Sequence, residues 1–455
     1  MDTQVPNVVI PVSVAPKKAP CPHCGKLGKR IRTLHRTVRT LMYKTIASLD
    51  IAYGEYQARC SCCCTFRTNP QSVLPKAKYD NKVRQAVLDR ILDDGLNVEA
   101  TLHCLQRDFL LNLSPGFVYD CLHDAAAALN LAEHRQSVLS RFQGVLCVDE
   151  IHLGQYTLLL ATDPVGDFPV AFALVATNDQ QHMERFLANL AHWGLQPKVV
   201  VTDRSNLYPS LIAKLWPKAE HQLCVFHVMQ DINELVLDAV KRLRGALKRR
   251  GRGGRRRKRG RPSRAQQRRA QKRGPTNKDK AQFVFKHRYL IVMRREKLQQ
   301  QQRRDLQKML EYLPELGTLR KFVDSIHRLF AAEQSEYQAW CRWWALRHNE
   351  LYWTVPELRQ VLEMLAMPEF SKMIAFLRGP ASLKRRIMVR TNNHVERCNR
   401  KLRFWEKVRY KWRRRRTLVR FIVLEMDRWW KEVFTPPAIK SGKGDQRTGT
   451  FASAA

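Results

Sequence analysis

The clearest strand signal in the chain is the stretch Val145-Leu146-Cys147-Val148-Asp149-Glu150, in which four apolar residues run directly into two acids. A short apolar run of this kind is typical of a buried strand. The same pattern returns at Val199-Val200-Val201-Thr202-Asp203. Either acid alone is ambiguous, because Asp203 can simply cap a helix that begins at Ser205. Two acids at equivalent strand ends instead indicate one cleft at the edge of a sheet.

The sequence around these two stretches has an α/β pattern. Apolar runs predict strands, and apolar residues at helical spacing predict the helices between them. The expected strands cover residues 145–148, 156–162, 170–177, 198–202 and 222–225, and the expected helices cover residues 183–193, 207–215 and 227–247. Residues 281–388 carry several tryptophans and have no strand signal. We therefore expect an α/β unit that is joined to an all-helical segment.

A third acid, Glu396, opens the last long helix in the stretch Thr391-Asn392-Asn393-His394-Val395-Glu396. Cations that suit phosphate groups surround it: Arg397, Arg400, Lys401 and Arg403. Three carboxylates that leave room for water and phosphate suit two Mg²⁺ ions. We therefore predict that Asp149, Asp203 and Glu396 are catalytic residues and metal ligands.

Two further acids lie beside this predicted site. Glu150 is expected to point to the other face if the strand continues, because side chains alternate along a strand. Glu406 is a fallback for the third acid. It lies ten residues after Glu396 on the expected helix, nearly three turns away, so both cannot face the same ions.

The net charge points to a polyanionic partner. The 455 residues include 81 Lys plus Arg and 41 Asp plus Glu, which gives a formal charge of +40. Such an excess favours nucleic acid, with a ribosome-associated or membrane-surface protein as the alternative. No apolar run is long enough to cross a bilayer, and residues 1–20 lack a signal-peptide pattern. We therefore expect no membrane partner.

An Arg/Gly/Gln-rich tract occupies roughly residues 248–275. It has almost no apolar residue and is expected to be disordered when free. Within it, Arg259-Gly260-Arg261-Pro262 matches the core of an AT-hook, whose arginines enter a narrow A·T minor groove. Nonspecific phosphate binding by a disordered linker is the default interpretation.

The N-terminal cysteines predict a structural zinc site. Cys21 and Cys24 form one Cys-x-x-Cys pair, and Cys60 and Cys63 form a second. Four thiolates from two such pairs complete a tetrahedral zinc shell, and the spacing fits a zinc ribbon. Cys62 and Cys64 are surplus, so either can replace Cys63 as a ligand.

Residues 76–142 read as three helices: 81–92, 98–110 and 117–129, the last capped at Ser114-Pro115. These proportions fit a helix-turn-helix with its third helix in the major groove. Simple three-helix packing gives the same pattern. The third helix also carries Asp120 and Asp124 and few cations, which weakens the DNA-contact interpretation.

The order of these features resembles the catalytic core of DDE transposases of bacterial insertion sequences. Asp149 follows the first strand, Asp203 follows the fourth, and Glu396 lies in a late helix. Cys224 and His227 resemble the Cys-x-x-His motif of the mutator-like group, and Thr391-Asn392-Asn393 resembles its motif near the last acid. The resemblance covers roughly residues 20–430.

This resemblance implies an RNase H-like fold, Mg²⁺ or Mn²⁺, cleavage at terminal inverted repeats, and strand transfer into target DNA. It also implies a homodimer on paired element ends, acting on double-stranded DNA in the bacterial cytoplasm at the nucleoid. A structural or positioning role near the site is expected for Cys224 and His227.

Together these features predict a multidomain α/β protein with an RNase H-like mixed sheet. The expected order is a flexible lead (1–19), a zinc ribbon (20–75), a helix-turn-helix (76–142), the first part of the core (143–247), a disordered Arg-rich linker (248–280), an all-helical insertion (281–388), the core completion with the Glu396 helix (389–432) and a flexible tail (433–455). Two alternatives to a transposase remain open: a non-catalytic DNA-binding regulator derived from one, and a structure-selective nuclease or resolvase.

Overall fold

The computed structural model describes residues 6–60, 63–250, 275–378, 389–408 and 414–434. The chain divides into two compact units: residues 1–135, 152–157 and 398–455 form one, and residues 136–151 and 158–397 form the other. None of the helices in the described ranges is long and apolar enough to span a membrane. Arg259, Arg261, Cys62 and the residues after 434 lie outside the described residues.

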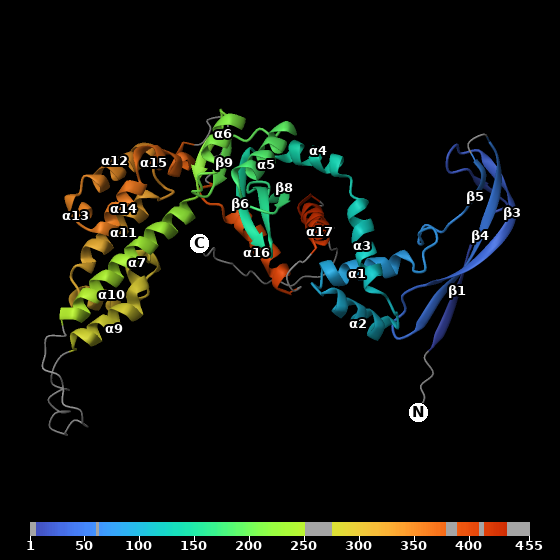
Figure 1. The fold of residues 1–455 in the computed structure, drawn as a ribbon, viewed down its shortest axis with the longest axis horizontal. Coiled ribbons are helices and arrows are strands. Elements are labelled where there is room, and N and C mark those ends of the chain that lie inside the picture. Colours follow the sequence, from blue (N-terminus) through green and yellow to red (C-terminus); the bar gives the residue numbers. More distant parts are fainter. Residues whose placement is uncertain (1–5, 61–62, 251–274, 379–388, 409–413, 435–455) are drawn as a thin grey trace, which may run out of the picture. The chain divides into compact units, whose positions relative to one another are not determined.

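The N-terminal part of the first unit is a five-stranded sheet (Figure 1). Its strands are β1 (Asn7–Val14), β2 (Lys18–Pro20), β3 (Leu27–Arg39), β4 (Ile46–Cys60) and β5 (Cys63–Arg67). The order is β1-β4-β3-β2, and β5 pairs with the second half of β4. On β4, the apolar residues Ala47, Leu49 and Ile51 are buried on one face of the strand, and Ser48 on the other face is buried as well.

The sequence predicted a flexible lead over residues 1–19, but part of this segment is a strand. Residues 7–14 form β1, which pairs in parallel with β4 from Asn7 opposite Ile46 to Val14 opposite Tyr53. Pro11 fits here because β1 is an edge strand, where a residue without an N–H is tolerated. Five of the eight residues of β1 are Val or Ile, but most of its side chains are exposed, so backbone pairing with β4 is its main support.

Helices follow the sheet: α1 (Asn81–Leu92), α2 (Val98–Phe109), α3 (Pro115–Ala127) and α4 (Leu131–Arg141). The first three confirm the predicted helices. The Ser114 side chain accepts a hydrogen bond from the Phe117 N–H, as expected for a helix cap. The sequence did not predict α4, which begins directly after Asn130, whose side chain accepts from the Glu133 N–H.

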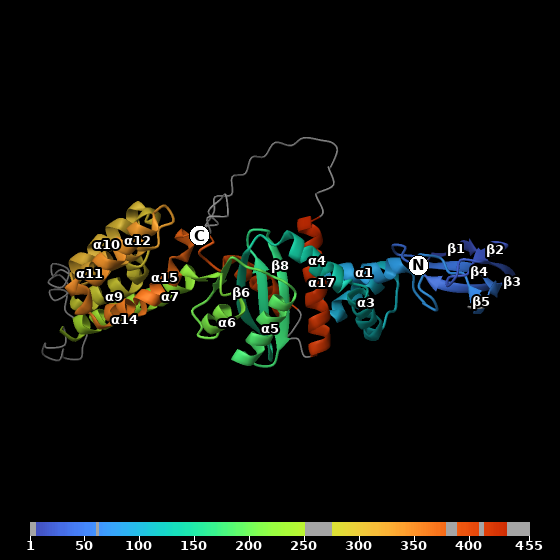
Figure 2. The same ribbon diagram turned by 90° about the horizontal axis from the view of Figure 1, so that it is seen from above.

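The second unit contains a five-stranded sheet of order β10-β9-β6-β7-β8 (Figure 2). The strands are β6 (Val145–Leu153), β7 (Tyr156–Asp163), β8 (Phe168–Val175), β9 (Val199–Thr202) and β10 (Glu220–Leu223), and the accompanying helices are α5 (Gln180–His192) and α6 (Pro209–Leu215). β6 pairs in parallel with β9, and β9 pairs in parallel with β10. The five strands and two helices confirm the predicted α/β pattern.

A helical bundle forms the rest of the second unit, and no strand occurs in the part of residues 225–378 that the structure describes. Its elements are α7 (Val225–Arg250), α9 (Asn277–His287), η1 (Arg288–Ile291), η2 (Arg295–Lys297), α10 (Gln300–Tyr312), α11 (Leu316–Leu329), α12 (Glu336–Arg347), α13 (Glu350–Trp353), α14 (Pro356–Met364), α15 (Met367–Met373) and η3 (Ala375–Leu377).

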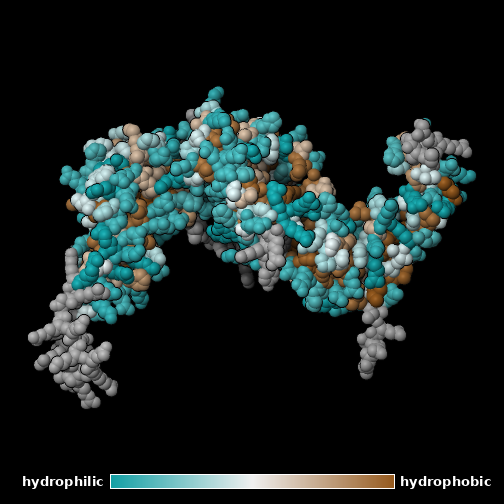
Figure 3. All heavy atoms as spheres, viewed as in Figure 1, coloured by the Kyte–Doolittle hydropathy of each residue, from teal (hydrophilic) through white to brown (hydrophobic). Residues whose placement is uncertain are grey.

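The helix α7 belongs to the core of this bundle. Its buried residues Val228, Ile232 and Val236 pack in one hydrophobic cluster with those of α11, α14 and α15. The sequence placed the end of the first part of the core at residue 247. Since α7 spans Val225–Arg250 and packs in the bundle, this boundary falls inside the bundle (Figure 1). The outward face of the bundle is largely hydrophilic (Figure 3), as follows from helices that bury one apolar face.

The C-terminal part contains two helices, α16 (Asn393–Val408) and α17 (Arg415–Phe434). The sequence predicted one helix through Arg416. Phe421 and Leu424 of α17 are buried in one cluster with Val118 of α3, so α17 packs on the N-terminal helices of the first unit. The apolar positions of α17 thus pack in the same cluster as those of α1–α3.

Candidate active site

The two strand-associated aspartates lie at the same edge of the central sheet. β6 and β9 pair in parallel from Val145 opposite Val199 to Cys147 opposite Val201. Asp149 and Asp203 each lie two residues beyond this last pair. The sequence predicted that this strand ends at Asp149. In the structure β6 continues to Leu153, so Asp149 lies within the strand.

Asn392 connects this edge to the segment that carries the third acid. Its fully buried side chain donates from Nδ2 to the Val148 carbonyl oxygen at 3.0 Å. Its backbone N–H donates to the Cys224 Sγ at 3.2 Å. The Cys224 N–H in turn donates to the Thr202 carbonyl at 2.8 Å. These bonds bring the start of α16 against the ends of β6 and β9.

The site is crowded with negative charge. Burial is the main cause that raises the pKa of Asp149 to about 7, and the adjacent charge of Glu150 is the second. The charges of Asp203 and Glu396 raise this pKa as well, so the three predicted acids lie within electrostatic reach of one another. Carboxylates in such a group repel each other unless a proton or a cation lies between them.

One oxygen of Glu396 is poorly satisfied in this arrangement. Oε1 is buried, and no hydrogen-bond donor of the described residues reaches it. Its ionic partner is His227 Nε2 at 3.5 Å, which is longer than a hydrogen bond. A buried oxygen of this kind fits a cation ligand, because a bound ion satisfies an acceptor without needing a proton.

Cys224, His227 and Glu396 form a cluster, and their candidate ligand atoms lie within 4.8 Å of one another. Burial raises the pKa of the Cys224 thiol, although its hydrogen bond from the Asn392 N–H opposes this shift. A thiol with a raised pKa is a weak metal ligand at neutral pH. Its contact with Asn392 instead fits the positioning role expected for this motif.

The sequence analysis missed a network around Glu150. Tyr208, which is fully buried, donates its hydroxyl proton to Glu150, and Asn178 Nδ2 donates to the other oxygen at 2.9 Å. Burial and the charge of Glu150 raise the pKa of Tyr208 well above its usual range. The two donors hold a negative charge beside Asp149. Only the adjacency of Glu150 to Asp149 signalled this in the sequence.

The turn between β7 and β8 holds the first turn of α16. Asp167 in this turn accepts from His394 Nε2 at 2.9 Å and also pairs with Arg397. The neighbouring Asp163 is fully buried and accepts from three backbone N–H groups, which fixes the turn. Arg397, expected to bind phosphate, therefore already has an acidic partner. Arg400 and Arg403 are exposed, whereas Lys401 lies 4.9 Å from the centre of the Trp429 ring.

The first predicted zinc pair lies in a tight turn between β2 and β3. The Gly25 N–H donates to the Cys21 carbonyl, and the Cys21 N–H donates to the Lys26 carbonyl, both at 2.9 Å. Gly25 has a φ of +74°, a conformation that favours glycine. Cys60 and Cys63 pair across the β4–β5 hairpin at the same end of the sheet, because Lys29 lies opposite Gln57. The side chains of Cys60 and Cys63 lie outside the described residues.

The exposed surface of α3 remains a weak candidate for the major groove. Val118, Cys121 and Leu122 face its core, so the outward positions include Asp120 and Asp124. Asp124 pairs with Arg84 of α1. This face therefore offers few cations to DNA.

A comparison with known families identifies the family of this chain. The family model of the ISL3 group of DDE transposases, described as a transposase, matches residues 146–418. The matched stretch contains Asp149, Asp203 and Glu396 and the helical bundle between the last two. No curated protein matches the chain at a significant level. The chain thus belongs to the ISL3 family of DDE transposases.

Proposed function

We propose that this transposase binds the terminal inverted repeats of its mobile element, cleaves DNA there, and transfers the 3′-hydroxyl ends into target DNA. Asp149, Asp203 and Glu396 are its catalytic residues. The observation that carries this proposal is that the charges of Asp203 and Glu396 both act on Asp149, whose pKa is raised to about 7 mainly by burial and then by the charges of Glu150, Asp203 and Glu396. A DNA-binding regulator has no need for such a costly group of acids.

The central sheet supports an RNase H-like core in this proposal. Strands β6, β9 and β10 run parallel, and β6–β8 lie side by side in chain order. The acids come from β6, from the end of β9 and from α16. The helical bundle between β10 and α16 is then an insertion into this core.

The donor set fits two Mg²⁺ or Mn²⁺ ions, with Asp149, Asp203 and Glu396 as their protein ligands. Hard carboxylate oxygens and the unsatisfied Glu396 Oε1 support this assignment. Bound ions of this kind activate the attacking oxygen and stabilise the leaving oxygen of an in-line displacement. Asn392 positions Glu396 by tying the start of α16 to Val148, and His227 orients the Glu396 carboxylate.

The N-terminal sheet and helices serve DNA recognition in the same proposal. One Zn²⁺ bound by Cys21, Cys24, Cys60 and Cys63 stabilises the end of the sheet where both turns meet. The helices α1–α3 and the exposed Arg400 and Arg403 of α16 contact double-stranded DNA. Two copies of the chain act as a homodimer on paired ends in the cytoplasm.

Three substitutions test the catalytic assignment: Asp149→Asn, Asp203→Asn and Glu396→Gln. Each is expected to abolish Mg²⁺-dependent cleavage of end DNA and to leave end binding within about twofold of wild type. Glu406→Gln is the matched control, because Glu406 lies further along α16, and it should cleave normally. A wild-type rate in all three variants would show that the acids are not catalytic. Binding of the wild-type chain without any cleavage would favour the regulator.

A further inference from the structure

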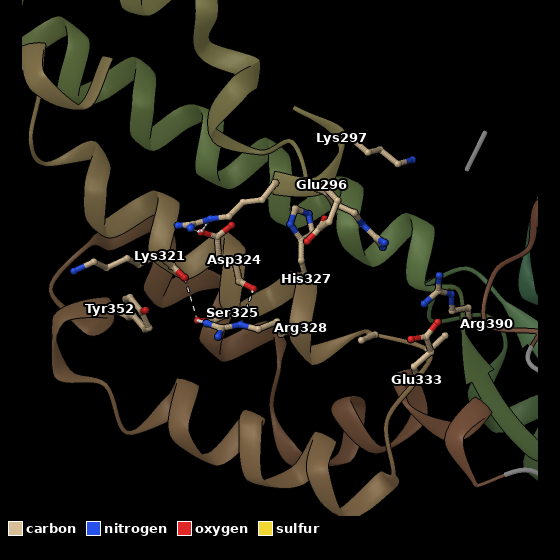
Figure 4. A pocket seen from close by; sticks show the side chains of 14 residues that line it. Glu296, Lys297, Lys321, Asp324, Ser325, His327, Arg328, Glu333, Tyr352 and Arg390 are labelled. Atoms are coloured by element: carbon tan, nitrogen blue, oxygen red, sulfur yellow. Dashed lines mark hydrogen bonds and ion pairs between the residues drawn. The ribbon is translucent and has the colours of Figure 1, made fainter. Parts of the chain in front are cut away.

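A basic pocket of about 930 Å³ opens in the helical bundle of the second unit (Figure 4). Six cations line it: Arg294, Arg295, Lys297, Lys321, Arg328 and Arg390. They come from the segment around η2, from α11 and from the segment that leads into α16. The pocket therefore gathers charge from three parts of the chain that are distant in sequence.

The acids of the pocket do not neutralise this charge. Three acids line it, Glu296, Asp324 and Glu333, against the six cations. Asp324 is already shared, because it pairs with Arg295 at 2.7 Å and with the buried Arg320 at 2.7 Å. The local balance therefore stays positive.

Four of the six cations form no ion pair with any of the described residues: Arg294, Lys321, Arg328 and Arg390. Two of them are nevertheless held in place. Arg390 donates to the Phe330 carbonyl at 2.8 Å, and Arg328 donates to the Asp324 carbonyl at 3.3 Å. Arg294 and Lys321 are exposed and carry their charge without such support. Positioned cations without acids are what an anionic ligand requires.

The cations also oppose one another. Burial, followed by the positive charge of Arg294, lowers the pKa of His327 to about 4. Burial and the charge of Arg294 lower the pKa of Arg390 in the same way. An anion in the pocket would relieve this repulsion.

A short segment of the chain joins one end of the pocket to the candidate active site. Lys321 and Tyr352 lie at one end and Arg390 at the other (Figure 4). The Arg390 carbonyl accepts from the Val225 N–H at 2.9 Å, and Asn392, two residues later, bonds to the Val148 carbonyl beside Asp149. Among the six cations of the pocket, Arg390 is therefore the one that the chain joins most directly to the three acids.

We propose that this pocket binds the phosphate backbone of the DNA strand that runs from the scissile phosphate toward the helical bundle. The inference rests on the proposed function, because it takes its ligand from the strand that the three acids cleave. The ligand class is a phosphodiester chain, whose successive charges match cations spread from Arg390 to Lys321. The bundle thus holds DNA next to the cleavage position.

The double variant Arg294→Gln/Lys321→Gln tests this in the full-length protein. Neither side chain is needed for folding, since both are exposed and have no ion pair in the described residues. Binding of end DNA is measured across a range of salt concentrations. Each lost phosphate contact reduces the slope of log K against log salt by about 0.9, so a reduction of roughly 1.8 is expected. Arg304→Gln, an exposed cation of α10 outside the pocket, is the control and should keep the wild-type slope.

Truncated DNA locates the contact. Two truncated DNAs are compared, each lacking the DNA on one side of the cleavage position. With one of them, wild type and the double variant should have the same salt slope. An unchanged slope in the double variant, or a difference that survives both truncations, would overturn the proposal. These outcomes are separate from the catalytic test. If the slope is unchanged while Asp149→Asn abolishes cleavage, the pocket proposal is wrong and the catalytic assignment stands. If the slope falls as expected while Asp149→Asn cleaves normally, the catalytic assignment is wrong and the pocket proposal stands.

Discussion

The raised pKa of Asp149 predicts that metal binding competes with a proton near neutral pH. With a pKa of about 7, this carboxyl is about 9% ionised at pH 6 and about 91% ionised at pH 8. A metal ion must displace the proton when the group is neutral. The apparent affinity for Mn²⁺ should therefore rise about tenfold from pH 6 to pH 8. An aspartate with an ordinary pKa near 3.9 would change this affinity by about 1%.

Titration calorimetry of Mn²⁺ into the full-length chain, without DNA, measures this dependence at pH 6, 7 and 8. Asp149→Asn should bind more weakly and lose the tenfold rise. His227→Gln removes the imidazole beside Glu396 and should keep the rise, which isolates Asp149 as its source. Equal wild-type affinity at pH 6 and pH 8 would refute the electrostatic description of the site.

The same shift has a consequence for stability without metal. The folded pKa of Asp149 lies above its unfolded value, so the folded chain binds the proton more tightly. The contribution of this group is therefore favourable at low pH and is lost as pH rises from about 4 to 7. The pKa of the buried Asp163 is raised as well, so urea unfolding should show a pH-dependent loss in both proteins, but a larger loss in wild type than in Asp149→Asn.

The remaining predictions concern groups around the site and the N-terminal sheet. Tyr208→Phe removes a buried donor to Glu150 and should lower the free energy of unfolding by about 1–3 kcal/mol in urea unfolding; no change would mean that the bond contributes nothing. Asn392→Ala leaves the Val148 carbonyl without this donor and should cost a similar 1–3 kcal/mol or so, with slower cleavage at unchanged DNA affinity; wild-type cleavage would exclude its positioning role. Strong chelation should accelerate hydrogen exchange in residues 20–75 before other regions, and unchanged exchange there would contradict the zinc site.

Local signals in the sequence predicted much of the second unit and three helices of the first unit. The runs before Asp149 and Asp203 are short, apolar and bounded, so strands β6 and β9 follow from the residues alone. Helices α1 to α3 follow from caps such as Ser114. In each case the information lies within a few neighbouring residues.

Elements that depend on distant partners were not predictable in this way. β1 contains Pro11 and mostly exposed side chains, and only its pairing with β4 makes it a strand. The sequence assigned α7 to the α/β core, but its apolar face packs in the helical bundle. No periodicity reveals that the bundle and α7 share one core.

Partners within the site were similarly hidden. Tyr208 lies 58 residues from Glu150, and Asp167 lies 230 residues from Arg397. The cations around Glu396 suggested phosphate binding, yet the structure gives Arg397 an acidic partner in the β7–β8 turn. Motif spacing identified the candidate acids, whereas the groups that tune them became visible only in the fold.

Manganese anomalous diffraction from crystals soaked in Mn²⁺ is the most direct test of the shared metal site. The expected result is manganese density about 2.0–2.6 Å from carboxylate oxygens of Asp149, Asp203 and Glu396 together. The catalytic assignment would be contradicted if at least one of these three carboxylates had no manganese ion bound to it.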